Sequence, residues 1–272
     1  MVARTTDVVS RAVKDEMIAK DQGAKVRERS SPEPQGNGMK RIDSTGSIKI
    51  TRTRKSLHLL RKVFHALAGV AFVSLYELFL TREQTMLVFG VIFVLLGSVE
   101  IIRVRYPKSW VAKLALRIMG MFARNYEKTH ASGMIFFVMG FLIVVGIFPK
   151  KIAVLSTLFL SIGDPCASAA GISYGYLGPR FSNGKSLVGV LGGTVACAIT
   201  AYLYYVRDMG HSSSLLLVSI IGGLAGSVTE ALCGRKIDGS GGPIDVDDNL
   251  AVPVGSGLMY YLCLVYFFPS FL

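Results

Sequence analysis

The chain has 272 residues, of which 51% are hydrophobic, and its mean hydropathy is +0.48. Soluble globular domains of this length rarely have so apolar a composition, whereas membrane helices satisfy their own backbone polar groups and can turn apolar side chains toward lipid. The formal net charge is +12, but the basic residues lie mostly outside the apolar segments and no nucleic-acid recognition module is visible, so no nucleic-acid partner is expected.

The first predicted region, residues 1–55, is rich in charged residues, serine and glycine and has little periodic apolar pattern. Such a composition buries too little apolar surface to fold, so we expect a disordered, basic and polar cytoplasmic region. Basic residues then concentrate between Lys49 and Lys62, where they either contact an anionic leaflet or only set the topology. Residues 56–272 are predicted to form one membrane-embedded domain.

This second region is predicted to be all-α and polytopic, because about seven apolar segments approach the ~20 residues that a helix needs to span a bilayer. The predicted transmembrane helices are Val63–Leu80, Thr85–Ile102, Ser132–Phe148, Ile152–Ile172, Val188–Val206, Leu215–Leu232 and Leu250–Phe268. Of the 30 Lys and Arg residues, all but four lie on the same side as the N-terminus; the exceptions are Arg82, Lys150, Lys151 and Arg207. This asymmetry predicts a cytoplasmic N-terminus and a C-terminus on the opposite side.

Between the second and third predicted spans, the segment from Lys108 to Arg124 has the pattern of an amphipathic helix lying at the membrane interface. Its apolar side chains recur at helical spacing, at Val111, Leu114, Ala115, Ile118, Met119 and Phe122. This helix either has a structural role or helps a lipid substrate to enter sideways.

Ionisable residues are rare inside membrane helices and usually mark a functional site. Here they agree in depth, since each lies toward the predicted cytoplasmic side: Arg61, Lys62, His65, Glu100, Arg103, His130, Asp164, Lys185, Glu230 and Asp248, with Asn249 beside the last. Cations neutralise phosphate oxygens, and carboxylates hold the divalent metal that bridges them. The mixture predicts a cytoplasmic-side active site for a nucleoside triphosphate, although charge pairs that stabilise helix ends are an alternative.

The motif GDPCASAAGISYG places Asp164, Ser168, Gly171 and Gly175 along one helical face. A stripe of small residues also packs membrane helices together, but packing does not call for a carboxylate. We therefore predict that Asp164 is catalytic and binds metal, while the two glycines either bind phosphate or pack against a neighbouring helix.

The motif NGKSLVGVLGG contains Gly-Lys-Ser but is not a P-loop, because Pro179 stands where the first glycine is required and no strand precedes it. A lysine at the start of a helix can still bind phosphate, helped by the free amides and the helix dipole. Asn183 and Lys185 are therefore predicted to bind nucleotide phosphate, with a simple topology signal as the alternative for the lysine.

The last connecting segment carries Asp238, Asp245, Asp247 and Asp248 among glycines. It either orders around a divalent metal or forms a solvated turn without EF-hand spacing. Asp248 is predicted to join Asp164 and Glu230 as a metal ligand, with Asn249 in support.

Two histidines, His65 and His130, lie near the predicted phosphate-binding cations. Either could act as general base for a lipid hydroxyl or donate a hydrogen bond to phosphate. A histidine at the membrane interface with no catalytic duty is the alternative for each.

Seven segments in sequence order resemble the CTP-dependent lipid kinases, and among them the yeast-type CTP-dependent diacylglycerol kinases more closely than the dolichol and phytol kinases. The resemblance runs from about Arg61 to Gly257 and rests on RKVFHALAG, EIIRVRYP, THASG, GDPCASAAGISYG, NGKSLVGVLGG, GLAGSVTEAL and DDNLAVPV. This chain has Ser132 where the yeast-type enzymes have asparagine, and a longer segment between Glu230 and Asp248, which bears on lipid specificity more than on chemistry.

The resemblance implies transfer of the terminal phosphoryl group of CTP to a lipid hydroxyl, with Mg²⁺ or Ca²⁺, in the endoplasmic reticulum or nuclear membrane. With diacylglycerol as acceptor, the product is phosphatidate. The positions that the resemblance implies are needed for activity are Arg61, Lys62, Asp164 and Gly171, and further motif positions are Lys185, Glu230, Asp248 and Asn249. Arg61, Lys62 and Lys185 are expected to hold the triphosphate. Alternatives are a dolichol or phytol kinase, a phosphatidate cytidylyltransferase, and a non-enzymatic membrane carrier or scaffold.

Overall fold

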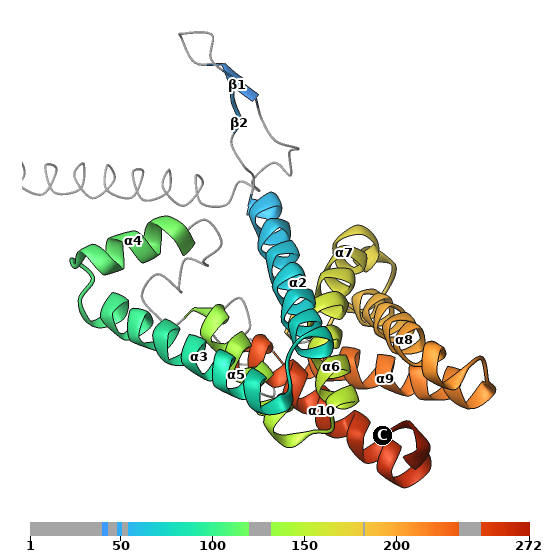
Figure 1. Ribbon diagram of the computed structural model, residues 1–272. Coiled ribbons are helices and arrows are strands. Elements are labelled where there is room, and N and C mark those ends of the chain that lie inside the picture. The colour runs from blue at the N-terminus through green and yellow to red at the C-terminus, as the bar shows by residue number, and fades with distance from the viewer. Residues whose placement is uncertain (1–39, 43–47, 51–53, 120–131, 182, 234–245) are drawn as a thin grey trace, which may run out of the picture. The chain divides into compact units, whose positions relative to one another are not determined.

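The computed structural model describes residues 40–42, 48–50, 54–119, 132–181, 183–233 and 246–272 (Figure 1). The chain divides into two compact units, Met1–Thr53 and Arg54–Leu272. In the first, strand β1 (Lys40–Ile42) pairs antiparallel with β2 (Ile48–Ile50). In β2 an isoleucine lies on either side of Lys49, the period-two pattern of a strand. The disorder expected for residues 1–55 stays a prediction. The other residues of this region, up to residue 53, lie outside the described residues.

The second unit is a bundle of helices (Figure 1). Its elements are α2 (Arg54–Leu78), α3 (Arg82–Arg105), α4 (Trp110–Met119), α5 (Gly133–Ile147), α6 (Lys150–Leu158), the π-helical turn η2 (Phe159–Gly163), α7 (Asp164–Tyr174), η3 (Gly175–Leu177), α8 (Leu187–Met209), α9 (Ser213–Leu232), α10 (Asp248–Phe267) and η4 (Pro269–Phe271). The predicted helical class is confirmed for this unit.

In the described residues, five stretches of helix are long and apolar enough to cross a membrane: α3, the continuous run Lys150–Leu177, α8, α9 and α10. Each contains, or nearly coincides with, one predicted span. The other two predicted spans are also helical, within α2 and α5, but α5 has 15 residues and α2 carries Lys62 and Glu77. The structure thus supports an integral membrane protein, with five candidate spans in the described residues where the sequence predicted about seven.

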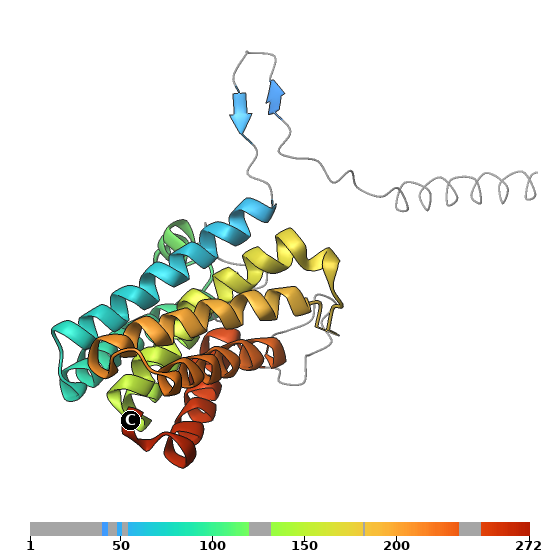
Figure 2. The same cartoon turned by 90° about the vertical axis from the view of Figure 1, so that its right-hand side faces the viewer.

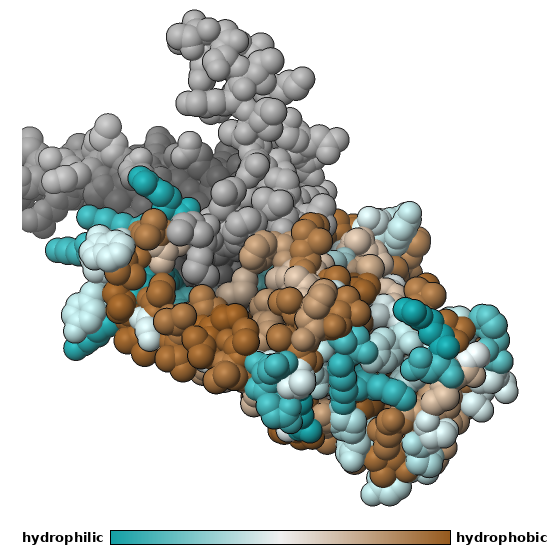
Figure 3. All heavy atoms as spheres, in the orientation of Figure 1, coloured by the Kyte–Doolittle hydropathy of each residue, from teal (hydrophilic) through white to brown (hydrophobic). Residues whose placement is uncertain are grey.

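Helix α3 turns most of its apolar side chains outward, and only 17% of its most apolar stretch is buried. Figure 3 shows the resulting hydrophobic surface over this helix. The exposed side chains include Leu87, Val91, Val94, Leu95 and Ile101. In water this surface would favour association, whereas hydrocarbon chains solvate it.

The run from α6 through α7 forms the centre of the unit, and Ile152 to Leu155 are fully buried in it. In Figure 2, α7 lies between α2 and α8. Helices α7 and α8 approach closely because small residues meet between them: a Cβ on Gly189 would lie 2.8 Å from the carbonyl oxygen of Ala167. Such contacts drive membrane helices together where lipid removes the hydrophobic contribution.

The predicted amphipathic helix is present as α4. Ala112 and Ala115 are buried, and the helix contacts α3. Leu114, predicted on the apolar face, is 46% exposed together with Trp110 at 74%. The small alanines allow close approach to α3, while Leu114 and Trp110 lie on the outer surface of the helix. Phe122 and the side chains of Ile118 and Met119 lie outside the described residues.

Candidate active site

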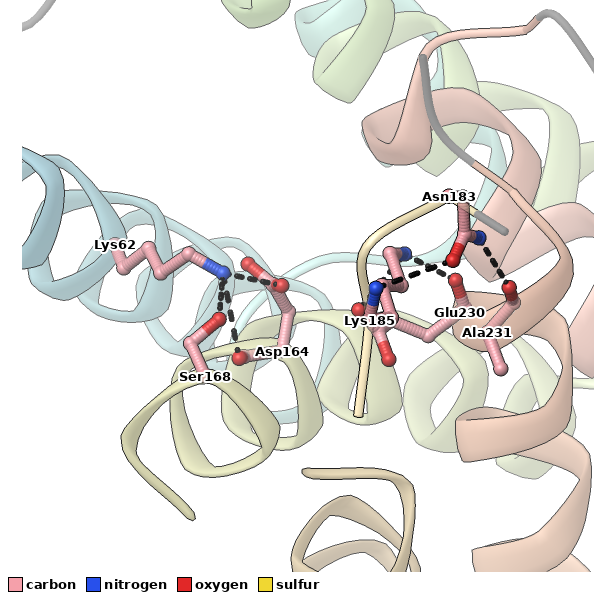
Figure 4. Close-up of polar contacts among 7 residues, drawn as sticks. All are labelled: Lys62, Asp164, Ser168, Asn183, Lys185, Glu230 and Ala231. Carbon is pink, nitrogen blue, oxygen red and sulfur yellow. Dashed lines mark hydrogen bonds and ion pairs between the residues drawn. The ribbon is translucent and has the colours of Figure 1, made fainter. Parts of the chain in front are cut away.

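Two lysine–carboxylate pairs meet at one end of the bundle, called here the site end, where α2 and α7 lie beside the start of α8, the end of α9 and the start of α10 (Figure 4). In the first pair, Lys62 Nζ of α2 lies 2.6 Å from Asp164 Oδ1 of α7. The same ammonium donates to the Ser168 hydroxyl. The Lys62 and Asp164 side chains are 18% and 21% exposed, so both charges are largely withdrawn from solvent yet accessible to a ligand.

The position of Asp164 follows from the proline after it. Pro165 has no backbone N–H, and its ring would collide with the carbonyl of Ser161, four residues back in an ideal α-helix. The π-helical turn η2 widens the helix over Phe159–Gly163 and removes this conflict. Asp164 is therefore the first residue of α7, and Ser168, one turn later, lies on the same face.

The second pair joins the start of α8 to the end of α9. Lys185 Nζ lies 2.8 Å from Glu230 Oε1 and also donates to the Glu230 carbonyl oxygen. Asn183 fixes this turn from both sides: its Nδ2 donates to the Ala231 carbonyl oxygen at 2.7 Å, and its Oδ1 accepts from the Lys185 N–H at 3.2 Å. Between them Gly184 has a φ of 83°, which glycine adopts readily.

The electrostatic surroundings keep Lys185 charged. Burial lowers the pKa of its ammonium, but the nearby Glu230 carboxylate, followed by Asp248 and more weakly Asp164, outweighs burial, so the pKa is raised above its ordinary value. The charges of both pairs therefore act on one another. Lys185 remains a cation throughout the physiological pH range.

The predicted metal ligands have suitable donor atoms, since carboxylate oxygens are what Mg²⁺ and Ca²⁺ prefer. Asp248, the first residue of α10, has a buried Oδ1 with no hydrogen-bond partner in the described part of the chain. However, among the described residues no group of three or more His, Cys, Asp and Glu side chains is arranged to hold an ion. Asp164 and Glu230 instead each hold a lysine.

The two predicted glycines lie against the start of α8. A Cβ on Gly171 would come within 2.9 Å of Ser186 Oγ, and one on Gly175 within 3.1 Å of the same atom. Gly175 is buried. Their observed contacts are those of helix packing, the alternative that the sequence left open.

Two of the remaining predicted residues make contacts with α5. The His65 ring packs edge to face on Phe137 of α5, with centroids 5.8 Å apart. Asn249 Nδ2 donates to the Gly133 carbonyl oxygen at 3.1 Å, which joins α10 to α5. The Arg61 side chain and all of His130 lie outside the described residues.

Two serines were absent from the predicted site residues. Ser168 contacts Lys62 directly. Its position four residues after Asp164, which puts both side chains on the same face of a helix, could have indicated this role. Ser186 is buried, and its hydroxyl accepts from the Gly189 N–H at 3.0 Å as the N-cap of α8. A serine directly before an apolar helical run indicates such a cap.

Comparison with known proteins finds several similar fungal sequences. CTP-dependent diacylglycerol kinase 1 of Schizosaccharomyces pombe is 31% identical over 228 residues, covering 80% of this chain and 100% of the relative. The proteins of the same name from Eremothecium gossypii and Saccharomyces cerevisiae are 28% and 25% identical, over 76% and 73% of this chain and 67% and 70% of theirs. No family model and no solved structure matches the chain.

Proposed function

This chain belongs to the family of CTP-dependent diacylglycerol kinases, and we propose that it transfers the terminal phosphoryl group of CTP to the hydroxyl of diacylglycerol, giving phosphatidate and CDP. The observation that carries the proposal is the pairing of Lys62 with Asp164 beside that of Lys185 with Glu230, at one end of a membrane-embedded bundle. Both charges needed to bind a metal-bound triphosphate are present there.

In this proposal, Lys62 and Lys185 exchange their carboxylate partners for phosphate oxygens when CTP binds, and Arg61 assists them. Asp164, with Glu230 or Asp248, would then hold a divalent cation, Mg²⁺ or Ca²⁺, which when bound neutralises phosphate charge. Ser168 and Asn183 orient the two lysines through the contacts described above. Phosphoryl transfer asks little covalent chemistry of the protein, so positioning and electrostatic stabilisation supply most of the rate.

The reaction forms one bond and breaks one. The lipid hydroxyl oxygen bonds to the γ-phosphorus, the bond from this phosphorus to the bridging β–γ oxygen breaks, and the hydroxyl proton leaves to a base. His65 and His130 are candidates for that base. The membrane delivers the lipid laterally, while the aqueous side delivers CTP.

The distribution of basic residues supports a site on the cytoplasmic side. All but four of the 30 Lys and Arg residues fall on the side of the N-terminus in the seven-span arrangement, which would put the C-terminus across an endoplasmic reticulum or nuclear membrane. Protease treatment of sealed microsomes should remove an N-terminal tag and spare a C-terminal one. The reverse pattern would contradict this topology.

The kinase proposal is tested by presenting the purified full-length chain in mixed micelles with CTP or ATP and with diacylglycerol, dolichol or phytol. We expect CTP and diacylglycerol to give the highest kcat/KM. Preferred phosphorylation of dolichol or phytol would keep the CTP-dependent chemistry but change the acceptor. Absence of any phosphorylated lipid would contradict the proposal and favour a carrier or scaffold.

A further inference from the structure

A third ion pair, more deeply buried than the two lysine pairs, lies between Glu100 and Arg103. Glu100 and Arg103, one turn apart on α3, are only 6% and 5% exposed. Arg103 donates to Glu100 Oε2 through Nε at 2.8 Å and Nη2 at 2.5 Å. Burying two charges is costly, and a pair of this kind often contributes little net stability. Its contacts with other helices are therefore more informative than its energy.

The other oxygen of Glu100 reaches the start of α5. Glu100 Oε1 accepts a hydrogen bond from the Ser132 backbone N–H at 3.3 Å. Ser132 is the N-cap residue of α5, but its own side chain makes no capping bond. The carboxylate of α3 thus supplies the acceptor, and the negative charge, that the first turn of α5 lacks.

The start of α5 in turn holds the start of α10. The carbonyl oxygen of Gly133, directly after Ser132, accepts from Asn249 Nδ2 at 3.1 Å. Farther along the same interface, Gly140 of α5 packs tightly against the Asn249 carbonyl oxygen and Pro253 of α10; a Cβ at this glycine would lie 2.8 Å from that oxygen. Asn249 is the neighbour of Asp248, whose charge acts on Lys185.

We propose that Glu100 is a positioning residue: held by Arg103, it fixes the start of α5 through the Ser132 N–H, and α5 fixes the start of α10, whose first residue is Asp248. The expected effect on CTP binding rests on the proposed function, whereas the contacts between the helices are observed in the structure. Loss of the Glu100–Ser132 contact should therefore weaken CTP binding without contact between Glu100 and the nucleotide.

The test removes one N–H. Ser132 has a φ of −78°, close to the value that proline imposes, so Ser132→Pro deletes the donor with little strain at this residue, whereas Ser132→Ala keeps the donor and removes only the hydroxyl. With labelled CTP and purified full-length chain in micelles without lipid acceptor, we expect the Kd for CTP to rise about fivefold or more for Ser132→Pro. For Ser132→Ala we expect the wild-type value.

Two further variants keep the inference falsifiable should Ser132→Pro fail to fold. Glu100→Asp keeps the charge beside Arg103 but withdraws the carboxylate from α5, and should weaken CTP binding in the same way. Asn249→Leu breaks the hydrogen bond to the Gly133 carbonyl oxygen, which is the next contact in the series. A double variant that combines it with Glu100→Asp or Ser132→Pro should bind CTP with a Kd within about twofold of that of the more affected single variant.

An unchanged Kd in Ser132→Pro and Glu100→Asp, an equal effect in Ser132→Ala, or additive effects with Asn249→Leu would each overturn the inference. A purely structural role would lower the fraction of active protein and leave the Kd and the KM for CTP unchanged, which also counts against it. If the wild-type chain binds CTP but phosphorylates no lipid, the proposed function fails while the binding comparison still tests this one.

Discussion

The two ends of the bundle both carry a lysine paired with a carboxylate, but in different surroundings. At the site end, the Lys185 and Glu230 side chains are 23% and 11% exposed and 2.8 Å apart. At the opposite end, Lys150 and Glu77 are 44% and 36% exposed and 3.7 Å apart. An exposed pair contributes about 0–1 kcal/mol, whereas a half-buried one also costs desolvation. The site end therefore holds charges that stability alone does not explain.

The continuous helical run from α6 through η2 to α7 connects the two ends of the bundle. Lys150 is the first residue of α6 and Asp164 the first of α7, which puts them roughly 21 Å apart along one axis. At the opposite end Lys150 also lies over the Tyr76 ring, 5.1 Å from its centroid. Contacts of this kind anchor a helix end at the membrane boundary, and paired substitutions at the two ends can therefore separate anchoring from chemistry.

The largest effect is expected at Asp164. Asp164→Ala should lower phosphorylation of diacylglycerol at least ~10³-fold, because it removes both the partner of Lys62 and a predicted metal ligand. The matched control is Glu77→Gln at the opposite end, which should keep activity within about twofold. Membrane fractionation checks that both variants insert, and full activity of Asp164→Ala would remove this residue from the mechanism.

The next effect concerns the charge of Lys185. Because Glu230 raises the pKa of this lysine against burial, Glu230→Gln should lower that pKa. CTP binding that needs the ammonium should then be lost at a lower pH than in the wild-type chain. Binding of labelled CTP measured from neutral to alkaline pH tests this; superimposable profiles would mean that Lys185 does not hold the phosphates.

A smaller effect is expected at Gly171. Alanine there brings a Cβ within 2.9 Å of Ser186 Oγ, and such overpacking costs about 1–3 kcal/mol. Gly90→Ala on α3 is the control, since nothing lies within 4 Å of its added methyl group. Thermal unfolding in detergent measures both. If Gly171 acts by packing, Ser186→Ala should partly restore stability and activity to Gly171→Ala; no rescue would favour direct contact with the nucleotide.

The smallest effect is expected at Lys150. Lys150→Met removes the exposed pair with Glu77 and should change thermal stability by no more than about 1 kcal/mol, with CTP binding unchanged. A large loss of CTP affinity would show that Lys150 influences the nucleotide site, and would contradict the assignment of this end of the bundle to anchoring alone.

Much of the candidate site was predictable because membrane burial makes ionisable residues informative. Lys62, Asp164, Lys185 and Glu230 were identified from their depth and charge. Their pairing was not, since Lys62 and Asp164 lie 102 positions apart and a single sequence carries no record of which helices meet.

Other differences come from packing that a local pattern does not encode. Helix α4 packs on α3 through Ala112 and Ala115, and the apolar pattern of α4 alone does not indicate which helix it contacts. The contact of Gly171 with Ser186 likewise depends on how closely α7 packs against α8, which the sequence of either helix alone does not reveal. The π-helical turn before Asp164 accommodates Pro165, but a proline alone does not predict it, since Pro253 lies inside the regular α-helix α10.

The account is tested most directly by the fate of the phosphorus atoms of CTP. The full-length chain is incubated with diacylglycerol, and separately with phosphatidate, using CTP labelled at either the α- or the γ-position. A kinase transfers only the γ-label, so labelled phosphatidate should form from diacylglycerol with γ-labelled CTP and none from the α-label. A lipid that carries only the α-label, formed from phosphatidate with release of pyrophosphate, would show a cytidylyltransferase and contradict the account.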